Sequence, residues 1–97
     1  MTIEVRQLTA LRATLDGSAD ATAALLRKEA LAAGFWLSAD GRIGEADLAA
    51  LLGMKPSVLA NRRREGAAPP SYALGGGGHR ITYRLTDAAL WLESHRA

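Results

Sequence analysis

Apolar residues recur every three to four positions through most of the first third of the chain, a spacing that predicts helices. One helix is predicted over residues 3–15, although its opening residues also alternate as a strand would. The run Asp16-Gly17-Ser18 is expected to end it in a turn. A second helix is predicted over residues 19–33, with Gly34 ending it in the left-handed conformation that glycine tolerates. The apolar positions are Val5, Leu8, Leu11 and Leu15, then Ala23, Leu26, Ala30 and Ala33, with Leu25 and Leu31 beside them.

The next segment, residues 35–43, carries a turn signal between apolar residues. Asp40-Gly41 in this setting predicts a tight turn and favours a small hairpin. The aromatic pair Phe35-Trp36 precedes the turn, and we expect it to belong to the core rather than to a binding platform.

Residues 45–66 have the pattern of two short helices joined by a tight turn. Gly44 stands at the expected start of the first helix, and Gly53 allows the sharp turn between the two. Pro56 suits the first position of the second helix, because its missing N–H is not needed there. The positions expected to face inward are Leu48, Leu51, Leu52, Met54, Val58 and Leu59.

The outward side of the second helix carries the candidate chemistry of the chain. Ser57, Asn61 and Arg64 are spaced four and three residues apart, so they share one face. Asn and Arg side chains bind adenine and guanine edges bidentately in the DNA major groove. A solubilising surface is the alternative, but such surfaces usually mix charge signs. The residues expected beside this face, suited to phosphates, are Lys55, Arg62 and Arg63.

Two strands are predicted after Pro69-Pro70 ends the second helix. They cover residues 71–74 and 80–85, and the glycine run at 75–78 joins them as a hairpin. Ile81, Tyr83 and Leu85 are expected to face the core, and Arg80, Thr82 and Arg84 to face outward. With His79 at the tip, the outward set is suited to a DNA backbone or minor groove. A phosphate-binding glycine loop is disfavoured, because His79-Arg80 opens a strand instead of a helix.

A last helix is predicted from Thr86, which we expect to cap it. Asp87 would lie in its first turn, and Leu90 and Trp91 are expected to close the core.

Charge is distributed unevenly over the 97 residues, although the net charge is only +2. Residues 1–50 carry five basic and seven acidic side chains, whereas residues 51–97 carry seven basic and three acidic ones. The second half is therefore the candidate surface for a polyanion. The length fits one domain with a modest core.

Several function classes find no support in the residue types. The chain has no cysteine, and its two histidines have no carboxylate cluster at metal-ligand spacing. No nucleophile motif or catalytic acid pair is visible, so we expect neither an enzyme nor a cofactor. The N-terminus is not signal-like and there is no long apolar run, so we expect neither secretion nor a membrane span. The expected location is the cytoplasm, with nucleoid association as a consequence of the DNA binding considered above.

Residues 43–93 resemble the winged helix-turn-helix of the excisionase and AlpA-like group, which is similar to the DNA-binding head of MerR-type regulators. The resemblance implies a mainly α fold with a small β-hairpin wing, the second helix in the major groove and the wing on a neighbouring minor groove. Such proteins act as recombination directionality factors or as transcription regulators of mobile elements. The chain departs from the family at Lys55, where Ser or Thr is usual, and at Arg62, where an aromatic is frequent. The matching residues are Leu48-Ala49, Leu52-Gly53, Pro56-Ser57, Leu59, Arg63 to Gly66, Pro69-Pro70, Tyr83 to Asp87 and Trp91-Leu92.

We therefore expect an N-terminal helical extension over residues 1–42 and a winged helix-turn-helix DNA-binding domain over residues 43–97. The expected partner is double-stranded DNA, with residues 3–33 as a candidate homodimer interface and a recombinase as a candidate second partner. The alternative is an adaptor that recruits a recombinase or packaging enzyme and contacts DNA little. The acidic, apolar N-terminal half is the feature that favours it.

Overall fold

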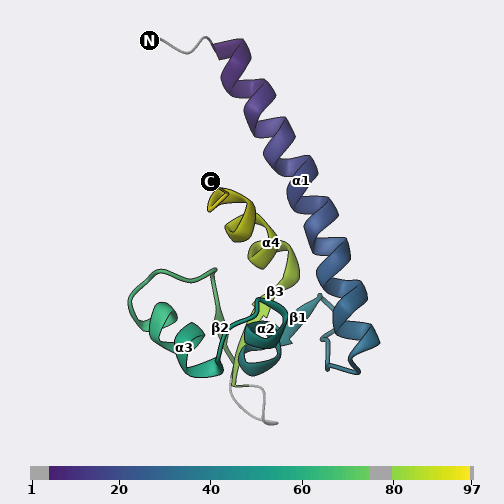
Figure 1. The fold of residues 1–97 in the computed structure, drawn as a ribbon, viewed down its shortest axis with the longest axis vertical. Helices are drawn as coiled ribbons and strands as arrows, with labels where there is room; N and C mark the ends of the chain where they lie inside the picture. Colours follow the sequence, from purple (N-terminus) through teal and green to yellow (C-terminus); the bar gives the residue numbers. More distant parts are fainter. Residues whose placement is uncertain (1–4, 75–79, 97) are drawn as a thin grey trace.

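Four helices and a three-stranded antiparallel sheet make up the part of the chain that the structure describes (Figure 1). The computed structural model describes the backbone of residues 5–74 and 80–96, and within those ranges the side chains from residue 17 onward. This is the predicted class, mainly α with a small β component. The elements are α1 (Val5–Ala32), β1 (Arg42–Gly44), α2 (Glu45–Leu51), α3 (Pro56–Arg64), β2 (Tyr72–Ala73), β3 (Ile81–Arg84) and α4 (Leu85–Ser94).

The first helix is continuous, and the predicted break at Asp16-Gly17-Ser18 is wrong. A single glycine inside a helix costs only about 1 kcal/mol relative to alanine, which neighbouring contacts can offset. Such contacts begin directly afterwards, because Ala19 is already part of the core. The predicted end at Gly34 is confirmed: Gly34 has φ +73°. The N–H of Phe35 donates to the Ala30 carbonyl at 2.9 Å, which closes the last turn.

The second half of α1 packs along α4, as Figure 1 shows. A hydrogen bond of 2.6 Å from the Thr22 hydroxyl to Glu93 joins the helices near the end of α4. The predicted extension and the predicted DNA-binding unit therefore share one core. Trp36 is more exposed than expected, whereas Phe35 packs against this core. Its buried apolar residues are Ala19, Leu26, Ala30, Ile43, Leu48, Ala49, Leu59, Tyr83, Leu85, Ala88 and Ala89.

The sheet has the order β1-β3-β2, so β3 is its central strand. The predicted pairing of the two late segments is confirmed in shorter form, with Tyr72 opposite Thr82. The tight turn at Asp40-Gly41 is also confirmed, since Gly41 has φ +78° and Leu37 bridges Ile43. The chain continues from this turn into β1, whose pairing with β3 the sequence pattern did not predict.

Four predicted side-chain positions are corrected by the structure. Thr82 is 1% exposed, because β1 and β2 flank its strand and the Arg42 guanidinium donates to its hydroxyl at 2.9 Å. Val58 is 38% exposed, since α3 buries only the adjacent Leu59. Leu90 is 49% exposed on the side of α4 away from the core. The residue at the N-cap of α4 is Arg84 rather than Thr86, because the helix begins directly at the end of β3.

The turn between α2 and α3 depends on one glycine. Gly53 has φ +73°, and a Cβ placed there would meet nothing within 4 Å. We therefore expect Gly53→Ala to lower the free energy of unfolding by about 1–2 kcal/mol through backbone strain alone. The matched control is Gly17→Ala inside α1, also in open space, which is expected to raise it by up to about 1 kcal/mol. Denaturant unfolding followed by circular dichroism measures both, and equal effects would contradict this account.

No helix within the described ranges is both long and apolar enough to cross a bilayer.

Candidate nucleic-acid interface

Helix α3 begins at Pro56 as predicted, but it ends at Arg64, before the Pro69-Pro70 pair that was expected to end it. Lys55 is the N-cap residue, with extended backbone angles and no side-chain capping bond. Pro56 follows at the start of the helix. At the other end Gly66 has φ +73°, and the N–H of Ala67 donates to the Arg62 carbonyl at 2.8 Å. One side of this short helix is anchored by Leu59, the only described α3 residue that is fully buried.

The face opposite Leu59 is exposed, as predicted. Ser57, Asn61 and Arg64 are all exposed. The Arg64 guanidinium donates to the Asn61 side-chain oxygen at 3.0 Å, so these two polar side chains already lie together on the surface. An amide and a guanidinium at this spacing present donors and an acceptor suited to base edges.

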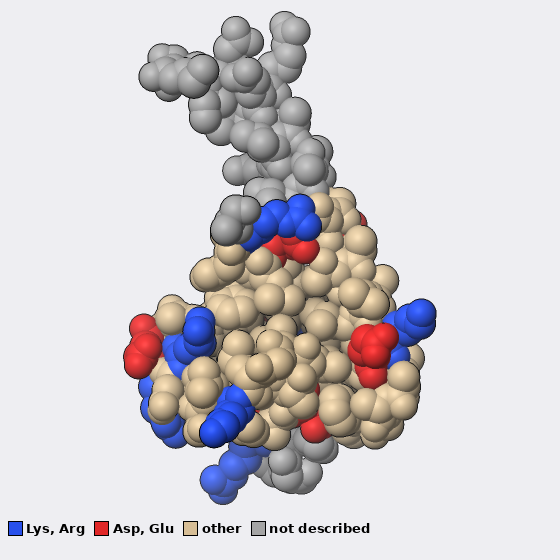
Figure 2. Space-filling view, in the orientation of Figure 1, with Lys and Arg blue, Asp and Glu red and all other residues tan. Residues whose placement is uncertain are grey.

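Lys55 and Arg62 are also exposed beside this face. Figure 2 shows Lys and Arg side chains gathered over α3 and below it, with fewer acidic side chains among them. The basic residues in the last turn of α3 also suit its dipole, because a helix C-terminus carries partial negative charge.

Arg63 differs from its predicted place beside the exposed face. Its Nε donates to Oε2 of Glu45 at 2.7 Å and its Nη2 donates to Oε1 at 3.3 Å, a two-pronged ion pair. The hydroxyl of Tyr83 donates to the same Oε2 at 2.6 Å. Glu45 opens α2, Arg63 lies near the end of α3 and Tyr83 lies in β3, so one carboxylate joins three elements. We call these three residues the Glu45 network.

The Glu45 network changes the ionisation of its members. Partial burial favours the neutral form of Glu45, but the hydrogen bonds from Arg63 and Tyr83 outweigh it, and the pKa of Glu45 is lowered. The Glu45 hydrogen bond raises the pKa of Arg63. Burial, together with the Glu45 carboxylate, raises the pKa of Tyr83. At neutral pH the network is therefore a carboxylate held by a cation and a neutral phenol.

The outer side of the sheet carries a second polar cluster around Tyr72. The guanidinium carbons of Arg42 and Arg84 lie 5.7 and 5.4 Å from the centre of its ring, respectively. Arg42 and Arg84 are directly opposite in the β1–β3 register, where two like charges repel. Asp40 offsets this repulsion, at 3.0 Å from Arg42 and 3.7 Å from Arg84. The Ser38 hydroxyl and then Arg42 lower the pKa of Asp40.

The structure describes some of the remaining predicted contact residues and not others. Arg84 is 47% exposed in spite of these contacts, and Arg80 is exposed beside the hairpin. His79 and the glycine run lie outside the described residues. Sequence reasoning missed Glu45, Asp40 and Arg42 as members of polar networks. Only Asp40 and Arg42 carried a local signal, since Asp40 lies in the predicted turn and Arg42 follows it directly.

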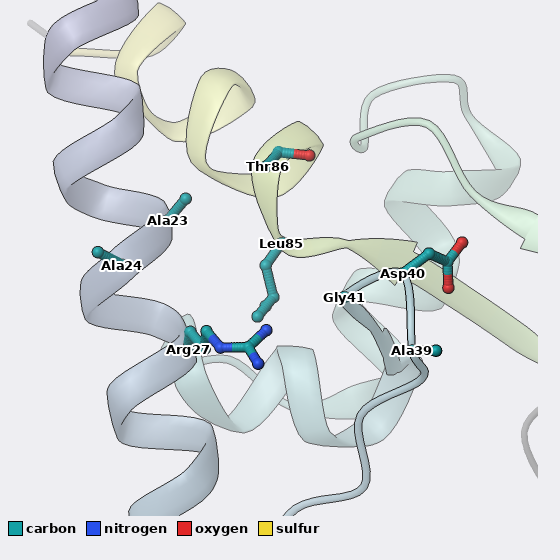
Figure 3. Close-up of a pocket in the computed structure, with 8 residues that line it drawn as sticks. All are labelled: Ala23, Ala24, Arg27, Ala39, Asp40, Gly41, Leu85 and Thr86. Atoms are coloured by element: carbon teal, nitrogen blue, oxygen red, sulfur yellow. The ribbon is translucent and has the colours of Figure 1, made fainter.

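A cavity of about 350 Å³ lies between α1, the turn before β1 and the start of α4 (Figure 3). The side chain of Arg27 extends into it from α1, whereas the Asp40 carboxylate points away toward the sheet. Small side chains make up most of the rest of its lining, and within the described ranges no group of His, Cys, Asp and Glu could hold a metal ion. The lining residues are Ala23, Ala24, Arg27, Ala39, Asp40, Gly41, Leu85 and Thr86.

Comparison with protein-family models, with curated proteins and with solved structures finds no match for this chain.

Proposed function

We propose that this protein binds double-stranded DNA in a sequence-specific manner, with α3 as the helix that enters the major groove. The observation that carries the proposal is the composition of α3: its exposed face combines Ser57, Asn61 and Arg64, while Leu59 ties the opposite side to the core. The major groove admits an α-helix, and bidentate contacts from Asn and Arg are the commonest way to distinguish base pairs there.

The surrounding elements support a winged helix-turn-helix arrangement. The α2–turn–α3 unit is followed by the β2–β3 hairpin, which brings Arg80 and Arg84 to exposed positions. Lys55 and Arg62 stand beside α3 with exposed cationic groups that suit phosphates. In this role the protein acts as an excisionase-like recombination directionality factor or as a transcription regulator of a mobile element, in association with the nucleoid.

The long α1 helix supports a homodimer on the DNA. The core face of its second half is occupied by α4, but Leu25 and Leu31 on the same helix are 56% and 58% exposed. The predicted apolar positions before residue 17 lie outside the described side chains. These exposed leucines equally favour the second candidate function, an adaptor that recruits a recombinase or packaging enzyme and contacts DNA little. A recombinase complex that survives nuclease and high salt would support that function over DNA binding.

Selection of bound duplexes from a random DNA pool tests the proposal directly. We expect a defined site, with two related half-sites if a dimer binds. Asn61→Ala and Arg64→Ala are each expected to reduce discrimination against mutated base pairs by about 1–3 kcal/mol. Binding to the selected site is also expected to weaken steeply with salt.

The matched control is Lys28→Ala, which removes an exposed cation on α1, away from α3. It is expected to leave both affinity and site preference unchanged. If the Asn61 and Arg64 variants keep the wild-type preference, α3 is not the recognition helix.

A further inference from the structure

We propose that Arg63 is a positioning residue of the DNA interface: through the Glu45 network it sets the orientation of α3 and is not itself a phosphate contact. The part of this inference that is tested with DNA rests on the proposed function. The part that concerns the orientation of α3 rests only on the geometry of the Glu45 network. It gives Glu45 and Tyr83, two residues outside the exposed face of α3, an indirect part in DNA sequence specificity.

The first step concerns what Arg63 is free to do. Two of its donor groups are engaged by Glu45 at 2.7 and 3.3 Å, and its side chain is only 25% exposed. Two-pronged Arg–carboxylate bonds are stronger than ordinary hydrogen bonds and hold the planar group in one orientation. Reaching a phosphate would break both bonds and leave a carboxylate near the DNA backbone. Arg62 and Arg64 on either side have exposed side chains, and the bond that Arg64 makes goes to the neutral amide of Asn61 rather than to a carboxylate.

The second step concerns the orientation of α3. The helix is only nine residues long, and within the described structure Leu59 is its only fully buried side chain. One apolar anchor leaves rotation and tilt about that point weakly restrained. The Arg63–Glu45 bond, one helical turn further along, supplies a second anchor on another element. Two separated anchors define the direction of the helix axis.

The third step connects α3 to the hairpin. Tyr83 is fully buried in the central strand and donates to the carboxylate that holds Arg63. The strand that carries Tyr83 also carries Arg84 and leads from the exposed Arg80. The Glu45 network therefore fixes the distance between the two surfaces proposed to contact DNA.

Base-edge and phosphate contacts respond differently to a change in helix orientation. Bidentate hydrogen bonds require alignment of both partners, whereas phosphate attraction acts over a longer range and tolerates displacement. Loss of a positioning residue should therefore reduce the preference for the selected site and preserve the salt dependence. Loss of a phosphate contact should do the reverse.

The experiment compares Arg63→Gln with Arg62→Gln, a neighbouring exposed arginine, on the selected duplex and on a random-sequence duplex at several salt concentrations. For R63Q we expect about a tenfold smaller affinity ratio between the two duplexes, with an unchanged slope of log affinity against log salt. For R62Q we expect an unchanged ratio and a slope smaller by about 1. A smaller slope with an unchanged ratio in R63Q would overturn the proposal.

Two further variants separate positioning from loss of folding. Arg63→Lys keeps the charge but only one prong of the bond, so we expect a ratio between those of wild type and R63Q. Tyr83→Phe keeps the ion pair and removes only the third hydrogen bond, so a smaller drop in the same ratio is expected. The proposal would be contradicted if wild type, R63K and Y83F had equal affinity ratios and only R63Q had a smaller one because it was unfolded.

A measurement without DNA keeps the inference distinct from the proposed function. Residual dipolar couplings of the free protein report the orientation of α3 relative to α4. We expect R63Q to change this orientation and R62Q to leave it as in the wild type. If the wild-type protein does not bind DNA but R63Q reorients α3, the proposed function fails and the positioning role of Arg63 stands. If α3 keeps its orientation in R63Q, the positioning fails whatever the DNA result.

Discussion

Replacing Leu59 with alanine is expected to lower the free energy of unfolding by about 2–5 kcal/mol. Leu59 is fully buried and is the only α3 side chain in the described core. Removing its branched end takes apolar surface out of contact and leaves a space that the neighbouring α2 would have to collapse into. Because a domain of this size has a net stability of only about 5–15 kcal/mol, this is a large fraction of the total. Urea unfolding at 25 °C measures the change.

The control for Leu59 is its neighbour. Val58 is 38% exposed, so Val58→Ala removes less buried surface than Leu59→Ala and replaces a β-branched residue with a better helix former. We expect its effect to stay within about 0.5 kcal/mol of the wild type. Similar losses for the two substitutions would mean that both side chains contribute to the core, as the sequence pattern first indicated.

Acidification is expected to remove the stabilisation that Glu45 supplies. Its folded-state pKa lies below the ordinary value of 4.5, so the unfolded chain takes up a proton first as the pH falls. The contribution is therefore complete above pH 4.5 and is lost progressively as the pH falls through the folded-state pKa. At neutral pH we expect Glu45→Gln to lower the free energy of unfolding by about 1.5–3 kcal/mol, the strength of a hydrogen bond to a charged group.

The pH series separates this effect from general acid sensitivity. The difference in stability between wild type and Glu45→Gln should shrink as the pH drops below 4.5, and urea midpoints from pH 7 to pH 3 record it. Asp47→Asn is the matched control, since Asp47 lies in the same first turn of α2 and outside the network. A constant difference across the series would show that the Glu45 charge contributes nothing beyond the shape of the side chain.

Local signals in the sequence predicted local features well. Gly34, Gly41 and Gly53 all adopt the positive φ that their turns require, and Pro56 opens α3. Each of these outcomes depends on the conformational range of one residue. The turn predicted at Gly17 was wrong for the same reason, because the flexibility of glycine permits a turn but does not impose one. Packing of the following residues in the core with α4 keeps the helix continuous there.

The candidate interface was predictable where exposure follows from helical spacing. Ser57, Asn61 and Arg64 share an exposed face because they lie three and four residues apart. The partner of Arg63 was not predictable, since Glu45 stands 18 residues away and meets it only after α2 and α3 have packed. Helical spacing from the buried Leu59 places Arg63 on the inner side of α3, but the local sequence does not identify the carboxylate that it meets there.

Pairing of β1 with β3 also determines which pieces of the chain can stand alone. Arg42 lies opposite Arg84, so the ladder closes a loop that contains all of α2, α3 and β2. The hairpin bridge at Leu37 and the bonds that Ser38 and Asp40 make to Arg42 hold the outer strand in place. A fragment cut at residue 43 would expose one edge of β3 and release Thr82 from its partner. A fragment with an intact sheet therefore begins no later than Leu37, and one that also keeps the contribution of α1 to the core begins before Ala19.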